Sequence, residues 1–299
     1  MGRMFDALQK VERQKHQEEL KVEPPKIKQE DLYLDNKLVS FFAQSSMAAE
    51  QFRRLRQHII KQGIEGSPKT IMLTSTVAGE GKTLIATNLA VMLATELHSH
   101  ALVVDCDLRN PALTHWFGFR EAKGLSDYLK GEAQLTDLLI STSIEKLSIL
   151  PGGSIQDNPV ELIGSNRMKS LVTELRSRYA DRYIILDCSP VLATTEPSVL
   201  NEMVDGILFV IKSGHTARES VQQALALLDR NKIIGVVLNA MEFRTTAMTR
   251  RYFGTNRYYY DYRYSKTHPE PTAWSKIRAL AGDAKMVFGR LRAGKKEDL

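Results

Sequence analysis

A lysine, a threonine and two glycines follow an apolar segment closely, with a spacing that is typical of phosphate-binding loops. The ten residues 74–83 read TSTVAGEGKT. The glycines let backbone N–H groups turn toward phosphate oxygens, and a helix opening after them directs its positive end to the same anion. Lys82 is expected to reach the β- and γ-phosphates of ATP, and the Thr83 hydroxyl to ligate Mg²⁺. The predicted nucleotide contacts are Gly79, Glu80, Gly81, Lys82, Thr83 and Leu84.

Three aspartates follow two other apolar segments. Asp105 and Asp107 come after Val103-Val104, and Asp187 comes after Leu186. A single aspartate at a strand end is commonly a helix cap or a turn residue. Three acids at the carboxyl edge of one parallel sheet, beside a lysine-bearing phosphate loop, are better explained as a Mg²⁺ and phosphoryl-transfer site.

Six of the ten tyrosines gather in one short segment near the C-terminus. They are Tyr252, Tyr258, Tyr259, Tyr260, Tyr262 and Tyr264, with arginines among them. Neither strand alternation nor helical periodicity accounts for this density, so we expect an exposed segment. A Tyr/Arg surface that stacks on RNA or single-stranded DNA uses the same residue types, but the phosphate loop and the acids make nucleic acid an unlikely partner.

The elements that must position these residues alternate between strand and helix. The expected strands are Thr70–Thr74, Ala101–Asp105, Leu147–Leu150, Tyr183–Asp187, Ile207–Ile211 and Ile233–Leu238, and one expected helix is Leu84–Leu97. This order predicts an α/β fold, a doubly wound and mostly parallel sheet of the P-loop NTPase type.

Four regions are expected along the chain. Residues 1–45 form an N-terminal helix and linker, 46–243 a P-loop ATPase or kinase domain, 244–266 a tyrosine-rich segment, and 267–299 a basic amphipathic tail. The tail carries apolar residues at helical spacing from Trp274 to Leu291, and it could lie on the inner membrane, on a partner or on its own domain.

Composition restricts the class of protein. The 299 residues are 43% hydrophobic and 25% charged, and no apolar run is long enough to span a bilayer. The first twenty residues lack the apolar core of a signal peptide, so we expect a cytoplasmic protein, with peripheral contact to the inner face of the cell membrane. Cys106 and Cys188 are expected to be free buried thiols, and much of the net charge of +6 lies beyond Arg244.

These residues together resemble the bacterial tyrosine kinases of capsular and exopolysaccharide synthesis, a branch of the deviant P-loop ATPases that includes the Min-type positioning proteins. The resemblance covers about residues 48–264. It rests on the phosphate loop, on Asp105-x-Asp107-x-Arg109, on Asp187, and on the weaker stretches 117–118, 124–129, 158–162 and 235–239. The segment Glu50–Arg56 is similar to the family's Glu-x-x-Arg-x-x-Arg subunit motif.

The resemblance implies roles for individual residues. Lys82, Asp105 and Asp107 would be catalytic, with Asp105 accepting the proton of the attacking tyrosine. Thr83, Asp107 and Asp187 would organise Mg²⁺, and Asn239 would contact adenine. Glu50, Arg53 and Arg56 would join subunits in a ring, the tyrosine cluster would be autophosphorylated, and the kinase would need a separate transmembrane polysaccharide co-polymerase as activator.

The chain departs from the family pattern at several positions. Thr76 stands where the phosphate-loop consensus has glycine, Ala78 where many relatives have proline, Cys188-Ser189 where Thr-Pro is common, and Glu196 where aspartate is frequent. Val77 replaces the signature lysine of the Min-type branch. The alternative function is a Min-like, nucleotide-switched assembly ATPase that controls polysaccharide machinery without phosphorylating tyrosine.

Overall fold

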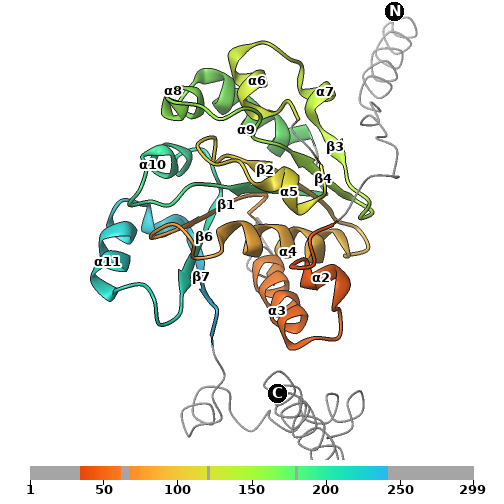
Figure 1. Ribbon diagram of the computed structural model, residues 1–299, viewed down its shortest axis with the longest axis vertical. Coiled ribbons are helices and arrows are strands. Elements are labelled where there is room, and N and C mark those ends of the chain that lie inside the picture. Colours follow the sequence, from red (N-terminus) through yellow and green to blue (C-terminus); the bar gives the residue numbers. More distant parts are fainter. Residues whose placement is uncertain (1–33, 62–67, 120–121, 179–180, 242–299) are drawn as a thin grey trace, which may run out of the picture. The chain divides into compact units, whose positions relative to one another are not determined.

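The described part of the chain contains one seven-stranded sheet with the strand order β3-β4-β2-β5-β1-β6-β7 (Figure 1). The computed structural model describes residues 34–61, 68–119, 122–178 and 181–241. The strands are β1 (Thr70–Ser75), β2 (His100–Asp105), β3 (Ile140–Ser141), β4 (Leu147–Leu150), β5 (Arg182–Asp187), β6 (Gly206–Lys212) and β7 (Ile233–Asn239). All neighbouring strands pair in parallel except β3, which is antiparallel to β4.

The six expected strands are all present, and each differs from its expected range by no more than one residue at either end. Every residue of β1 is buried, as are five of the six residues of β2 and of β5. Such continuous burial is typical of parallel strands that are covered by helices on both faces, and it explains their unbroken apolar sequence. The two-residue strand β3 has too few residues for a sequence pattern and was not expected.

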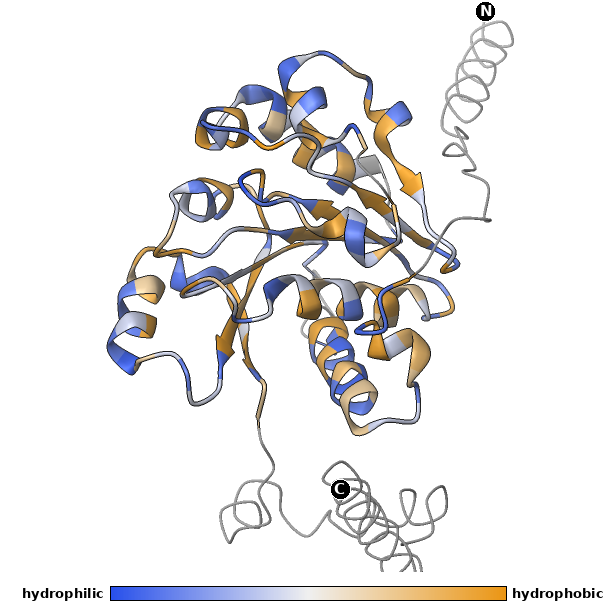
Figure 2. Ribbon diagram, in the orientation of Figure 1, coloured by the Kyte–Doolittle hydropathy of each residue, from blue (hydrophilic) through white to orange (hydrophobic). Residues whose placement is uncertain are grey.

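Helices cover both faces of the sheet. They are α2 (Val39–Phe42), α3 (Met47–Lys61), α4 (Lys82–Ala94), α5 (Leu113–Trp116), α6 (Leu125–Lys130), α7 (Leu135–Leu138), α8 (Pro159–Ile163), α9 (Asn166–Arg178), α10 (Glu196–Leu200) and α11 (Arg218–Ala226), with a 3₁₀ turn at Arg230–Lys232. One core lies between the sheet and helices α2 to α5, and the other between the sheet and helices α6 to α11. Figure 2 shows the apolar strands between these two helical layers. The doubly wound α/β fold predicted from the sequence is confirmed.

Helix α4 is enclosed on all sides, which explains why it is apolar around its whole circumference. Eleven of its thirteen residues are buried. It packs on β2 and β5 on one side and on α2 and α3 on the other. A helix that is apolar all round must be buried in this way. It begins at Lys82, two residues before the expected start, because the phosphate loop itself leads into its first turn.

Core packing begins before residue 46, where the sequence places the start of the ATPase domain. Leu38 is fully buried. The Asn88 side chain of α4 accepts a hydrogen bond from the Ser40 amide and donates one to the Lys37 carbonyl. Residues 37–40 are therefore fastened to α4, a contact that no local pattern in their sequence indicates.

Strand β7 forms one edge of the sheet. Val236 and Leu238 are both about half exposed, and the strand pairs only with β6 within the described residues.

The helices of the described ranges include no candidate for a membrane-spanning segment.

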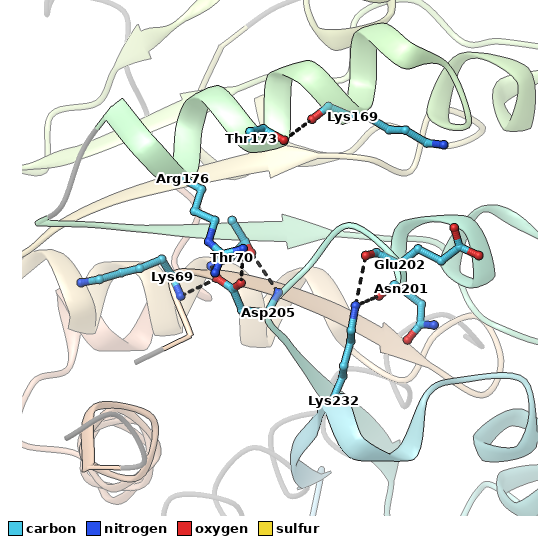
Figure 3. A network of polar contacts seen from close by, with 9 residues as sticks. All are labelled: Lys69, Thr70, Lys169, Thr173, Arg176, Asn201, Glu202, Asp205 and Lys232. Carbon is cyan, nitrogen blue, oxygen red and sulfur yellow. Dashed lines mark hydrogen bonds and ion pairs between the residues drawn. The ribbon is translucent and has the colours of Figure 1, made fainter. Parts of the chain in front are cut away.

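A polar network fixes the start of β6 to the start of β1 at the amino edge of the sheet (Figure 3). Asp205 Oδ2 accepts hydrogen bonds from the amides of Lys69 and Thr70, each at 3.0 Å. Its own amide donates to Thr70 Oγ1 at 2.9 Å, and its Oδ1 pairs with Arg176 of α9 at 3.0 Å. Lys232 donates nearby to the carbonyls of Asn201 and Glu202. This network sets the register of the two central strands at the end opposite to the phosphate loop.

Replacement of Asp205 by alanine should lower the free energy of unfolding by about 2–4 kcal/mol, because two backbone amides lose a charged acceptor. Arg176→Ala is the matched control: its side chain is 60% exposed, so its removal should cost at most about 1 kcal/mol. Urea unfolding of both variants measures the difference. Equal losses in the two variants would show that the ion pair, and not the bonds to the backbone, holds this edge.

Candidate active site

The phosphate loop has the backbone shape that its glycines suggest. Gly79 and Gly81 adopt φ values of +80° and +94°, in the left-handed region. Gly81 is the residue immediately before α4, so the first amides of that helix face the loop. Lys82, the first residue of α4, is 9% exposed. Free amides at the start of a long helix, together with a confined lysine, make this loop an anion site.

Glu80 holds the loop in place from inside. Its side chain is fully buried. One carboxylate oxygen accepts from the Val77 amide at 2.9 Å, and the other accepts from the Lys212 amide at 3.1 Å and from the Thr216 hydroxyl. Burial acts to raise the pKa of Glu80, but these hydrogen bonds, that of Thr216 first, outweigh it and the pKa is lowered. The Glu80 carboxylate therefore joins the phosphate loop to the end of β6, and the predicted nucleotide contact of this residue stays a prediction.

Asn239, at the end of β7, lies over the loop from the other side. Its Nδ2 donates to the Glu80 carbonyl at 2.8 Å, and its Oδ1 accepts from the Ala240 amide. A Cβ on Gly81 would come within 2.2 Å of the same Nδ2. The positive φ favours glycine at position 81, and a Cβ there would also displace the Asn239 side chain.

Asp105 is a buried acceptor of backbone hydrogen bonds. Its Oδ2 accepts from the amides of Ala112 and Leu113 at 2.9 and 3.0 Å, and its Oδ1 accepts from that of Asp107 at 3.2 Å. The residue is 1% exposed. It therefore holds the first turn of α5 against the end of β2.

Asp187 stands directly opposite Asp105, because the two residues are register partners on β5 and β2. Its Oδ2 accepts a 2.6 Å hydrogen bond from the Thr83 hydroxyl. Its Oδ1 is buried without a hydrogen-bond partner in the described part of the chain. A buried carboxylate oxygen without a donor is expensive, so this atom is suited to a cation or to a water bound to one.

The acids lie in a shared electrostatic environment. Burial, followed by the charge of Asp187, raises the pKa of Asp105 to about 8. Burial likewise raises the pKa of Asp187 to about 6, while Lys82 and the Thr83 hydroxyl oppose the shift. The pKa of Asp107 is raised by burial, against the opposing charge of Lys82. The carboxyl groups and Lys82 thus act on each other, an arrangement that is typical of functional sites.

The described residues contain no group of three His, Cys, Asp or Glu side chains that could hold a metal by themselves. Thr83, Asp187 and the less buried Asp107 nonetheless offer the oxygen atoms that Mg²⁺ prefers. In P-loop proteins the phosphates and waters complete the coordination shell, so this donor set fits a Mg²⁺ that arrives with a nucleotide.

The loop after β4 closes the site beside Asp105. The amides of Leu125 and Ser126 donate to the carbonyls of Pro151 and Gly152, so the 124–129 stretch fastens this loop. A Cβ on Gly152 would lie 2.8 Å from the Pro111 side chain and 3.5 Å from Asp105 Cγ. The sequence pointed to the 124–129 stretch but not to the loop that it supports.

The segment after β5 carries a residue that the sequence did not identify as part of the site. Glu196, the first residue of α10, is 1% exposed and accepts a hydrogen bond from Arg109 Nε at 3.0 Å. Its position was noted only as a departure from aspartate. An acidic residue in a helical first turn is common, so no signal in the sequence could have linked it to Arg109.

The proposed subunit motif makes contacts within its own chain. Arg53 pairs with Glu50 at 2.6 Å on the surface of α3. Arg56 donates to the Met92 carbonyl at 3.2 Å and pairs with Glu96 at 3.5 Å, so it faces the end of α4. The Glu50–Arg53 pair is one third exposed, whereas Arg56 is mostly covered.

The tyrosine-rich segment 244–266 and the amphipathic tail 267–299 lie outside the described residues, as do residues 1–33 of the expected N-terminal helix and linker. Cys106 and Cys188 are free and buried, as expected.

Known proteins are similar to this chain in sequence and in fold. A family model described as an AAA domain matches residues 68–234. The chain is 30% identical over 208 residues to the tyrosine-protein kinase YwqD of Bacillus subtilis, covering 69% of this chain and 86% of that protein. It is 28% identical over 235 residues to the tyrosine-protein kinase wzc of Salmonella typhi, covering 78% of this chain but only 31% of the length of that relative.

Solved structures agree. The crystal structure of the chimerical protein CapA2B2 superimposes with a TM-score of 0.65 at 31% identity, covering 70% of this chain and 95% of that one. The kinase domain of the Escherichia coli tyrosine kinase ETK gives a TM-score of 0.65 at 25% identity, covering 70% of this chain and 82% of that domain.

Replacement of Gly81 by alanine should destabilise the nucleotide-free protein more than replacement of Gly79. Both changes strain a left-handed backbone, at about 1–2 kcal/mol, but a Cβ at position 79 meets nothing within 4 Å. The additional loss in Gly81→Ala comes from displacing Asn239, so it should vanish in an Asn239→Ala background. Urea unfolding of the two single variants and the double variants tests this. Equal losses at positions 79 and 81 would contradict it.

The metal-free, nucleotide-free protein should become less stable as the pH rises from about 4 to about 8. Asp105 and Asp187 have raised pKa values, so the folded state retains protons that the unfolded state releases. Their contribution is complete below an unfolded pKa near 3.8 and is lost as the pH passes about 6 and then about 8. We expect the free energy of unfolding to fall steadily over this range in chelator-containing buffer, with a smaller slope in Asp105→Asn. Increasing stability over this range would contradict the assignment.

Proposed function

The chain belongs to the bacterial tyrosine-protein kinases, a family with the P-loop ATPase fold, and from that premise we propose that it transfers the γ-phosphoryl group of Mg·ATP to tyrosine hydroxyls, including those of its own residues 252–264. The observation that carries the proposal is the meeting of Lys82, Thr83, Asp105, Asp107 and Asp187 at one edge of the sheet. The tyrosine cluster at residues 252–264 favours a kinase over a nucleotide-switched ATPase that phosphorylates nothing.

In the proposed reaction the tyrosine oxygen attacks the γ-phosphorus and the bond from that phosphorus to the β,γ-bridging oxygen breaks. ADP leaves with the electron pair, and the tyrosine proton passes to a carboxylate, for which the proposal takes Asp105. The raised pKa of Asp105 makes its ionised form a stronger base, and a cation bound beside the acids would favour that ionised form. Its backbone hydrogen bonds and its burial mean that it must become accessible when the acceptor binds.

Each remaining residue has a proposed part. Lys82 and the amides of 79–84 would bind the phosphates, and Asn239 would contact the adenine base. Thr83, Asp107 and Asp187 hold Mg²⁺, which neutralises phosphate charge when it is bound. Since the transition state of phosphoryl transfer is loose, positioning and charge neutralisation supply most of the rate enhancement.

The proposal extends to partners. Glu50, Arg53 and Arg56 would line a contact between subunits in a ring, in which one subunit donates its tyrosines to the site of the next. The activator would be a separate transmembrane co-polymerase, which would hold the kinase at the inner face of the membrane, with the basic tail as a second contact. The process controlled would be capsular or exopolysaccharide synthesis and export.

Incubation of the full chain with Mg·ATP, alone and with the cytoplasmic segment of a candidate activator, should produce phosphate on tyrosines 258–264, mapped by mass spectrometry. Lys82→Met should reduce the rate of tyrosine phosphorylation by about 100-fold or more, since it removes a preorganised charge. Asp105→Asn should abolish the phosphotyrosine product. Lys69→Met is the matched control, because Lys69 stacks on Tyr183 at 4.5 Å just ahead of β1, away from the phosphate loop.

Binding of ATP without phosphotyrosine in any of these conditions would favour the Min-like, nucleotide-switched assembly ATPase instead. Phosphotyrosine that persists in Lys82→Met would indicate a contaminating kinase.

A further inference from the structure

The ion pair between Arg109 and Glu196 joins two loops of the site. Arg109 lies in the loop after β2, two residues beyond Asp107, and Glu196 opens α10 after β5. The loop before α10 is itself fastened to the phosphate loop, since the amides of Val191 and Leu192 donate to the carbonyls of Ser75 and Thr76. The pair thus connects the acidic loop to a framework that includes the phosphate loop.

The two ends of the pair differ in exposure. The Glu196 side chain is 2% exposed, whereas the Arg109 side chain is 45% exposed. Glu196 Oε1 accepts from Arg109 Nε, and Glu196 Oε2 is buried without a hydrogen-bond partner among the described residues. A buried carboxylate carries a large desolvation cost, which a pair held through a single hydrogen bond compensates poorly. Stability alone is therefore a weak reason for this arrangement.

The ion pair engages only one of the three nitrogen atoms of the Arg109 guanidinium. Nε is engaged by Glu196, and within the described ranges the Nη groups have no hydrogen-bond or ionic partner. Burial raises the pKa of Asp107, and the charges of Lys82 and, to a smaller extent, Arg109 act against this increase. Arg109 is therefore near enough to Asp107 to act on its charge, as Lys82 does. Two free Nη groups in a planar fork are suited to the oxygens of a phosphoryl group.

We propose that Arg109 is a phosphoryl-binding residue that contacts the γ-phosphoryl group during transfer, and that Glu196 is the positioning residue that fixes its orientation. The inference rests on the proposed kinase function. When the tyrosine oxygen attacks the γ-phosphorus, the negative charge of the phosphoryl oxygens must also be neutralised on the side away from Lys82. A guanidinium fixed before the nucleotide binds loses little orientational freedom when it meets the phosphoryl oxygens.

Binding measurements separate this role from a structural one. The probes are Mg·ADP and Mg·AMP-PNP, a non-hydrolysable ATP analogue, titrated into the full-length protein by calorimetry. Arg109→Ala should weaken AMP-PNP binding by about tenfold or more, the value of a hydrogen bond to a charged group, and change ADP binding less than about twofold. Glu196→Gln should have an intermediate effect, and Glu196→Asp, which keeps the charge, a smaller one.

The matched control is Arg176→Ala, which breaks another 3.0 Å arginine–carboxylate pair at the opposite edge of the sheet. It should leave the affinities for both probes unchanged. In turnover assays Arg109→Ala should raise the KM for ATP in parallel with the weaker AMP-PNP binding and also lower kcat, and added guanidinium ion should restore part of the rate. Thermal unfolding of each variant identifies any that fail to fold, and Arg109→Lys then replaces Arg109→Ala.

The outcomes separate the inference from the proposed function. If the wild-type protein binds neither probe, the kinase proposal fails. If the wild-type protein binds both and the Arg109 variants lose affinity for ADP and AMP-PNP equally, or for neither, the kinase proposal stands and the role of Arg109 is overturned.

Discussion

The parallel pairing of β2 with β5 is the constraint on which the site depends, because it sets Asp105 directly opposite Asp187. Two carboxyl groups at the ends of adjacent buried strands cannot both ionise without a nearby cation, and burial raises the pKa of each. The fold supplies part of that charge from Lys82, since β1 lies next to β5 and ends in the phosphate loop. Asp187 Oδ1 has no hydrogen-bond partner among the described residues, so the compensation there is incomplete. A cation that binds together with a polyphosphate would complete it, so the acids and the phosphate loop form one electrostatic unit.

The rest of the structure keeps that unit in register. Asp205 fixes β6 to β1 at the amino edge, and Glu80 fixes the phosphate loop to the end of β6 at the carboxyl edge. Each of the two carboxylates accepts hydrogen bonds from backbone amides, and such bonds are worth most where water is excluded. The Glu80 carboxylate therefore holds the phosphate loop from its buried side. The opposite side of the loop remains open to a ligand.

The sequence predicted the strands and the phosphate loop well, because both depend on local patterns. A continuously apolar run such as β1 indicates a strand buried on both faces, and the glycines before Lys82 indicate a tight turn into a helix. Contacts between distant residues were not predictable in this way. Glu80 appears in the sequence as part of a nucleotide motif, yet its partners Lys212 and Thr216 lie more than 130 positions away. The pairing of Arg109 with Glu196 spans 87 positions and depends on where α10 begins.

The number of residues between the end of β7 and the tyrosine cluster sets how far the tyrosines can reach from the phosphate loop. Asn239 is fixed by its side chain to the Glu80 carbonyl and by its own carbonyl to the Ser213 amide, so the strand ends beside the phosphate loop. From Met241 to Tyr258 the chain can span at most about 60 Å when fully extended. That length exceeds the distance across a small domain, so reach alone would permit transfer within one chain as well as between chains. Delivery to a neighbouring subunit, as proposed, must therefore be enforced by the arrangement of subunits, and α3, with its exposed Glu50–Arg53 pair, is the element of the described chain assigned to that contact.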